Sequence, residues 1–143
     1  MIPGFVEISQ ESIALAEAEA VSAAEALGGR GTPVASPIPG LVGVEVPDTQ
    51  SWGVLAGRLA LARRCLVAVA ASADPASAAR AEGQRGGSAA FRRIGEPSGG
   101  AADKTVLECG RAFKAGGGSI DLETPSRRYW VVAGTDGLQA LFE

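Results

Sequence analysis

The spacing of apolar residues in the first half of the chain predicts the order strand, helix, strand, strand, helix, strand. Apolar residues recur every three or four positions from Ile13 to Leu27, which is the period of a helix with one buried face. Short runs rich in Val, Ile and Leu favour strands. The six elements are expected at residues 4–9, 12–27, 32–39, 40–46, 49–61 and 63–70, and the alanines of the last segment leave a continued helix as its alternative. This is the split βαβ, or ferredoxin-like, order, in which two helices cover one face of an antiparallel sheet.

Polar and glycine residues mark where the two helices begin and end. Ser9 or Ser12 can cap the first helix, because a serine hydroxyl accepts a hydrogen bond from the first free backbone N–H groups. Gly28 ends that helix, since glycine adopts the left-handed conformation without strain. Asp48 or Thr49 is placed to cap the second helix. The proline-rich stretch over 32–39 restricts any strand there to a sheet edge.

The second half predicts a different set of elements. They are a helix over 75–82, a flexible break over 83–88, a strand over 89–95, a helix over 103–115, an extended piece over 120–125, and a hairpin over 129–142. The change in composition after residue 72 indicates two units, 1–72 and 73–143. The expected fold class is therefore α+β.

Composition excludes several kinds of chemistry. The chain has no histidine, which removes histidine-based catalytic triads and histidine metal sites. Cys65 and Cys109 do not form a C-x-x-C pair, so neither a zinc site nor a disulfide framework is expected. The two thiols are typical of a reduced, cytoplasmic protein. No stretch approaches the length of a membrane span, and the N-terminal residues lack the basic start of a signal peptide.

Charge is distributed unevenly along the chain. Residues 1–57 carry one basic residue against seven acidic ones, a net charge of −6. Residues 58–143 carry twelve basic residues against nine acidic ones, a net charge of +3. Such an asymmetry is typical of a chain that presents a positive face to an anion, although an ordinary solvated surface gives the same count.

The order of motifs in the second half resembles a THUMP domain, an RNA-binding module of tRNA-modifying enzymes. The motifs that carry the resemblance are Phe91-Arg92-Arg93-Ile94-Gly95, Glu108-Cys109-Gly110-Arg111, Ile120-Asp121-Leu122-Glu123-Thr124-Pro125 and the hairpin that follows them. The segment 4–71 is similar to the ferredoxin-like region that precedes THUMP in archaeal tRNA guanine-10 N2-methyltransferases. The resemblance implies a ferredoxin-like N-terminal unit followed by a THUMP-like unit.

The sequence also departs from that family. It has neither a glycine-rich S-adenosylmethionine loop nor the Asn/Asp-Pro-Pro-Tyr/Phe motif of the family's methyltransferase domain. We therefore expect no catalytic residue and no cofactor in this chain, and whether it belongs to an enzyme is left open. The resemblance implies that S-adenosylmethionine binds a separate or missing catalytic domain. A methyltransferase domain or subunit is then a partner alongside tRNA.

Basic side chains are the candidate RNA-binding residues, because they can neutralise phosphates. Two of them share a strand and are expected to point to opposite faces, two lie on one helix face near a third pair, and the last pair lies at a helix-to-strand junction. These eight residues are Arg92, Arg93, Arg111, Lys114, Arg127, Arg128, Arg63 and Arg64. An exposed arginine that merely covers apolar surface is the alternative for each.

The aromatic pair Tyr129 and Trp130 is expected to pack in the core, although one ring could stack on a base. The function that these residues predict, together with the resemblance, is tRNA binding. By resemblance, the chain would position the acceptor end for a tRNA-modifying methyltransferase. The alternative is a protein-interaction or small-ligand regulatory module on a ferredoxin-like scaffold.

Overall fold

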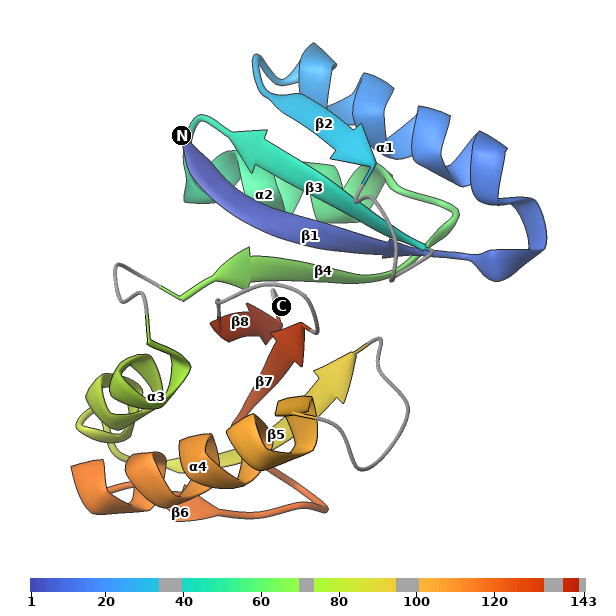
Figure 1. Cartoon of the computed structure of the whole chain (residues 1–143). Coiled ribbons are helices and arrows are strands. Elements are labelled where there is room, and N and C mark those ends of the chain that lie inside the picture. Colours follow the sequence, from blue (N-terminus) through green and yellow to red (C-terminus); the bar gives the residue numbers. More distant parts are fainter. Residues whose placement is uncertain (34–39, 70–73, 95–100, 133–137, 142–143) are drawn as a thin grey trace. The chain divides into compact units, whose positions relative to one another are not determined.

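A computed structural model describes residues 1–33, 40–69, 74–94, 101–132 and 138–141. The chain forms two compact units, Met1–Ala68 and Val69–Ala140 (Figure 1). Each unit combines helices with a β-sheet, so the α+β class predicted from the sequence is confirmed.

The first unit has the predicted order of elements. They are β1 (Ile2–Ile8), α1 (Ile13–Ala26), β2 (Arg30–Pro33), β3 (Leu41–Val46), α2 (Thr49–Arg58) and β4 (Ala62–Ala68). The strand order is β2-β3-β1-β4, and each neighbouring pair is antiparallel. This is the ferredoxin-like arrangement. As predicted, β2 is an edge strand, while residues 34–39 of the predicted strand lie outside the described residues.

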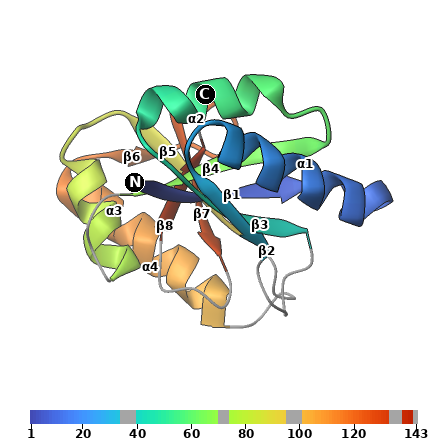
Figure 2. The ribbon, with the colours of Figure 1, turned by 90° about the horizontal axis from the view of Figure 1, so that it is seen from above.

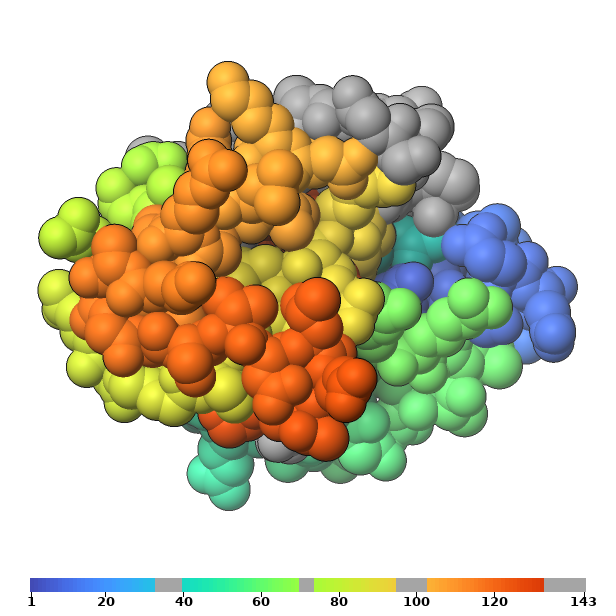
Figure 3. Space-filling view, turned by 90° about the horizontal axis from the view of Figure 1, so that it is seen from below, coloured from blue at the N-terminus to red at the C-terminus, as the bar shows by residue number. Residues whose placement is uncertain are grey.

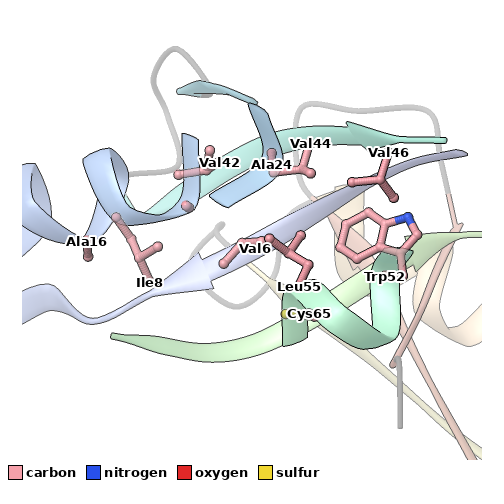
Figure 4. Close-up of a cluster of buried hydrophobic side chains, with 11 residues drawn as sticks. Val6, Ile8, Ala16, Ala24, Val42, Val44, Val46, Trp52, Leu55 and Cys65 are labelled. Carbon is pink, nitrogen blue, oxygen red and sulfur yellow. The ribbon is translucent and has the colours of Figure 1, made fainter. Parts of the chain in front are cut away.

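Both helices of the first unit pack on one face of its sheet, where the core forms (Figures 2 and 4). Alternate residues of β1 and β3, such as Val6 and Val44, point into this core. From α1 only alanines are fully buried, which lets this helix lie close to the sheet. From α2, Trp52 is fully buried, and its indole N–H donates to the main-chain oxygen of Ile2 at 3.1 Å.

The helix predicted over 49–61 ends earlier, at Arg58. Leu59 takes an extended conformation, and the backbone N–H groups of Ala60 and Leu61 donate to the Glu19 carboxylate at 2.9 and 3.0 Å. An acceptor on α1 therefore replaces the helical acceptors of these two groups, which a local pattern could not indicate. Asp48 caps α2 as predicted, and Gly28 has a φ of +80°. Ser9 caps a short 3-10 turn, Gln10–Ser12, that precedes α1, whereas Ser12, at the N-cap of α1 itself, makes no capping bond with its side chain.

The second unit contains α3 (Pro75–Gly83), β5 (Ser88–Ile94), α4 (Ala101–Gly116), β6 (Ser119–Ile120), β7 (Arg127–Val132) and β8 (Leu138–Leu141). Its strand order is β8-β7-β5-β6. Strand β5 runs parallel to both β6 and β7, and β8 returns antiparallel to β7, as the predicted hairpin requires. The predicted turn at 135–137 lies outside the described residues.

Helices α3 and α4 pack on one face of this second sheet, around three aromatic rings. Phe91, Phe113 and Tyr129 lie with their ring centroids 5.0 to 6.1 Å apart. At their C-terminal ends the two helices touch backbone to backbone. A side chain at Gly83 would overlap the main chain of Phe113, and one at Gly116 would overlap the main chain of Arg80.

Two predicted segments differ in the structure. Residues 84–87 form a hydrogen-bonded turn rather than an open break, with Gly86 N–H donating to the main-chain oxygen of Gly83 at 2.9 Å. The extended piece predicted over 120–125 is a strand only to Ile120. The Asp121 carboxylate then accepts hydrogen bonds from the backbone N–H groups of Thr124 and Glu123, and these bonds lower its pKa and turn the chain.

Candidate nucleic-acid interface

A shallow groove of about 340 Å³ lies in the second unit between α4 and the segment that follows it. Its lining residues are Phe91, Val106, Leu107, Gly110, Arg111, Lys114, Ile120 and Leu122. Figure 3 shows this surface, where α4 (orange) and the chain after it (red-orange) border β5 (yellow). No acidic side chain is among the described residues that line the groove.

The floor and walls of the groove are apolar but open to solvent. Leu107 and Leu122 are each 62% exposed, although exposed leucines are usually scattered rather than gathered on one groove. Phe91 forms the deep end and belongs to the core below. The groove therefore offers apolar contact area that the fold itself leaves uncovered.

Two of the predicted basic residues line this groove, and a third lies at the edge of the sheet beside Leu122. Arg111 and Lys114 are exposed on α4 and line it directly. Arg92 is exposed on β5, and its guanidinium donates to the main-chain oxygen of Leu122 at 3.4 Å, at the edge of the sheet. None of the three forms an ion pair with another described residue, so their positive charge is available to a ligand.

Two other predicted residues, one in each unit, are instead paired with acids of the fold. Arg92 and Arg93 do point to opposite faces of β5, and Arg93 lies on the helix side, 2.5 Å from the Asp103 carboxylate of α4. On β4, Arg64 lies 3.0 Å from the carboxylate of Glu7, its partner in β1. Arg63 is exposed beside it, in the first unit.

Arg127 and Arg128, which were predicted to lie near the α4 cations, point to opposite faces of the sheet. Arg127 points toward the helices and is 22% exposed; its Nη1 donates to the Glu82 carboxylate and to its main-chain oxygen, both at 3.2 Å. It also donates to the Tyr129 hydroxyl at 3.1 Å and lies 5.3 Å from the centroid of the Phe113 ring. Arg128 is exposed and, by alternation along β7, points away from the helices.

The aromatic pair of the second unit and the thiol of each unit are buried in the interior. Tyr129 and Trp130 are both buried, as predicted, and burial and the Glu82 carboxylate raise the pKa of the Tyr129 hydroxyl. Cys65 and Cys109 are free and buried, and burial raises their pKa to about 11 and about 12. Within the described ranges, no three acidic or thiol groups are close enough to hold a metal ion.

The groove residues Leu107, Gly110 and Leu122 were not among the predicted site residues. A signal for them exists on α4. Buried Cys109 and Phe113 and half-buried Val106 form the stripe that faces the core. Exposed Leu107, Arg111 and Lys114 and half-buried Gly110 recur at the same helical spacing on a second stripe. A leucine and a glycine in line with two cations on the outer face of a helix indicate a contact surface.

Comparison with known proteins places the fold. No family model and no curated protein matches this sequence. Solved structures do match over the whole chain. PH1313 from Pyrococcus horikoshii OT3 matches at 12% identity and a TM-score of 0.67, over 100% of this chain and 54% of that one. TrmN from Thermus thermophilus matches at 21% identity and a TM-score of 0.57, over 99% of this chain and 44% of that one. A third is a 4-thiouridine synthetase crystallised with RNA and bound ATP, which matches at 10% identity and a TM-score of 0.61, over 100% of this chain and 41% of that one.

These likenesses are ones of fold, at low sequence identity. The chain spans about half the length of PH1313, and less of the other two proteins. Among the described residues, no helix combines the length and apolar character that crossing a membrane requires.

Proposed function

We propose that this chain binds RNA through the groove of its second unit and serves tRNA modification. The observation that carries the proposal is the pair of exposed cations Arg111 and Lys114 that line an apolar groove, with exposed Arg92 at the sheet edge beside Leu122. None of the three has an acidic partner among the described residues. Cations position RNA phosphates, and apolar surface contacts unpaired bases. The fold of a synthetase crystallised with RNA supports this role.

The finer proposal is that the RNA is tRNA and that the chain holds its acceptor end. The resemblance to THUMP proteins and the fold shared with 4-thiouridine synthetase and TrmN support it. Catalysis would belong to another domain or subunit, a methyltransferase that binds S-adenosylmethionine. This chain would contribute position: it fixes a distant part of the substrate, so that the target base reaches the catalytic domain in the right orientation.

The test is fluorescence anisotropy with an unmodified tRNA, with and without its single-stranded 3′ end, across a salt series. Replacing Arg92, Arg111 and Lys114 together by glutamine removes three phosphate contacts. The slope of log affinity against log salt should then become less steep by about 2. Removing the 3′ end should weaken binding to the wild-type chain.

A matched variant controls for net charge. It replaces three exposed arginines outside the groove, Arg30, Arg58 and Arg80, by glutamine. Its affinity and salt slope should stay close to those of the wild-type chain. Equal losses in the two variants would show that overall charge, rather than this groove, determines binding, and would contradict the proposed site.

The alternative function, a protein-interaction module, is favoured by the exposure of Leu107 and Leu122. A protein partner held by these leucines would bind with little dependence on salt, because apolar burial is only weakly sensitive to ionic strength. The same salt series therefore separates the two functions.

A further inference from the structure

The outer face of α1 is acidic and carries one large apolar residue that the core of the first unit does not use. Leu15 is 63% exposed and is flanked on the helix by exposed Ala14 and Ala18, whose short side chains leave it prominent. Glu11, one turn earlier, is exposed and forms no ion pair with another described residue. From residue 10 to residue 26 the chain has four acidic residues and no basic one. This face therefore presents a leucine and a carboxylate to a partner.

The groove of the second unit offers the complementary groups. Leu107 is 62% exposed on the α4 wall, and Leu122 is equally exposed on the other. Gly110 has no side chain to fill the floor between these walls. Arg111, one turn after Leu107, is a cation without an acidic partner in the described part of the chain. An apolar groove with cations on its rim suits a helix whose exposed face combines a leucine with acids.

The spacing of these groups favours one direction of docking. On α1 the acid comes four positions before the leucine, Glu11 and Leu15, whereas on α4 the cation comes four positions after it, Leu107 and Arg111. Residues four apart lie one above the other on one helix face. With the two leucines in contact, an antiparallel α1 therefore brings Glu11 to Arg111. A parallel α1 would bring Glu11 to Asp103, where two carboxylates repel each other.

We propose that α1 of one copy of the chain docks, antiparallel to α4, in the groove of a second copy. Leu15 enters between Leu107 and Leu122. Glu11 meets Arg111 on the rim. The contact joins two different surfaces of the chain, and one helix face in a shallow groove is a small interface, so copies associate only at high concentration. This inference goes beyond the proposed function and does not rest on it, because the leucines and charges are in place whatever else the groove binds.

Sedimentation equilibrium of the full chain at low salt, from about 10 µM to about 1 mM, measures this association. The wild-type chain should pass from monomer to larger species as its concentration rises. Leu15→Ser should weaken the association about tenfold, because one leucine is no longer buried. A wild-type chain that stays monomeric over the whole range would overturn the proposal, as would a Leu15→Ser chain that associates like the wild type.

A charge exchange tests the direction of docking. Glu11→Arg and Arg111→Glu each bring like charges together, and each should weaken association about fivefold. A chain that carries both changes has the pair again in reverse, and should associate within about twofold of the wild type. Thermal unfolding, expected to be unchanged because both positions are exposed, shows that the variants are folded.

The matched control for charge is Glu25→Arg, the same change at an exposed acid of α1 that lies beyond the contact. Its association should equal that of the wild-type chain. Equal losses in Glu11→Arg and Glu25→Arg would show that overall charge acts rather than this contact, and would overturn the proposal. A double exchange that restores no association would overturn the antiparallel pairing of Glu11 with Arg111.

The failure of this inference is distinct from that of the proposed function. A chain that binds RNA and stays monomeric would keep the proposed function and overturn the docking of α1. A chain that associates through Leu15 and binds no RNA at low salt would keep the docking of α1 and overturn the proposed function. Where both hold, added RNA should dissociate the associated copies, because RNA and α1 then compete for one groove.

Discussion

Arg127 should contribute more to the stability of the second unit than any of the exposed arginines. Its guanidinium lies near the C-terminal end of α3, where it donates to the main-chain oxygens of Glu82 and Gly86 and to the Glu82 carboxylate. Main-chain oxygens at a helix C-terminus carry partial negative charge, and the guanidinium adds to the bond that the Glu82 main-chain oxygen accepts from the Arg85 N–H at 3.1 Å. A positive side chain at this position therefore satisfies several acceptors at once.

The magnitude follows from what remains when the guanidinium is removed. In an Arg127→Met variant the Glu82 carboxylate, 19% exposed, keeps its hydrogen bond from Tyr129 at 2.7 Å and its ion pair with Arg85 at 2.8 Å. Breaking a fully buried pair costs about 3–5 kcal/mol, and these two remaining partners place the variant at the lower end, about 3 kcal/mol. Arg127→Lys keeps the charge but loses the planar fork, and should cost about 1.5 kcal/mol.

Each unit contains one tryptophan, which makes the assay specific. A Trp52→Phe background leaves Trp130 as the reporter of the second unit during urea unfolding. In this background Arg127→Met should lower the urea midpoint by more than about 1 M. The neighbouring Arg128 is exposed, so Arg128→Met is the matched control and should lie within about 0.5 kcal/mol of its parent. An Arg127→Met chain as stable as the Arg128→Met chain would refute this reasoning.

Three further predictions concern both units. Glu19→Ala should destabilise the chain by about 1–3 kcal/mol in chemical unfolding, because two backbone N–H groups after α2 lose their acceptor, while the exposed Glu25→Ala should cost far less. Cys65 and Cys109 should react with a thiol reagent at pH 8 only after unfolding, because burial raises the pKa of each; fast modification of the folded chain would contradict this. Hydrogen bonds from Ser51 lower the pKa of Asp48, so its contribution to stability is present above its unfolded pKa and is lost as the pH falls through the folded one; unfolding of Asp48→Asn should depend less on pH below about 4.

The fold could be predicted from the sequence wherever the determining interactions are local. The stripe along α1, its glycine stop and the alternation along β1 and β3 each arise within one element, and their order suffices for the ferredoxin-like arrangement. The end of α2 shows the opposite case. Residues 59–61 have helical composition, yet Glu19, 41 and 42 positions earlier in the chain, accepts the N–H groups of Ala60 and Leu61 and ends the helix.

The sequence indicates which residue types could bind RNA, but not which of those side chains the fold leaves without an acidic partner. An arginine is recognisable in any sequence, but its freedom depends on acids from distant elements: Glu82 occupies Arg127, Asp103 occupies Arg93 and Glu7 pairs with Arg64. The groove was harder still to predict, because its two walls come from α4 and from a segment that is extended for only two residues.

The backbone contact between the C-terminal ends of α3 and α4 has a consequence for how the second unit can vary. Side chains in a core can be exchanged for others of similar volume, and the elements then shift slightly to fit. Two main chains in contact cannot be adjusted by exchanging side chains in this way. The contacts at Gly83 and Gly116 therefore fix the position of the C-terminal end of α4 against α3. A methyl group at either glycine would force the helices apart and move one wall of the groove. Sequence drift in the aromatic core should therefore alter melting temperature well before it alters the width of the groove, and a designer who wishes to widen the groove should begin at these contacts.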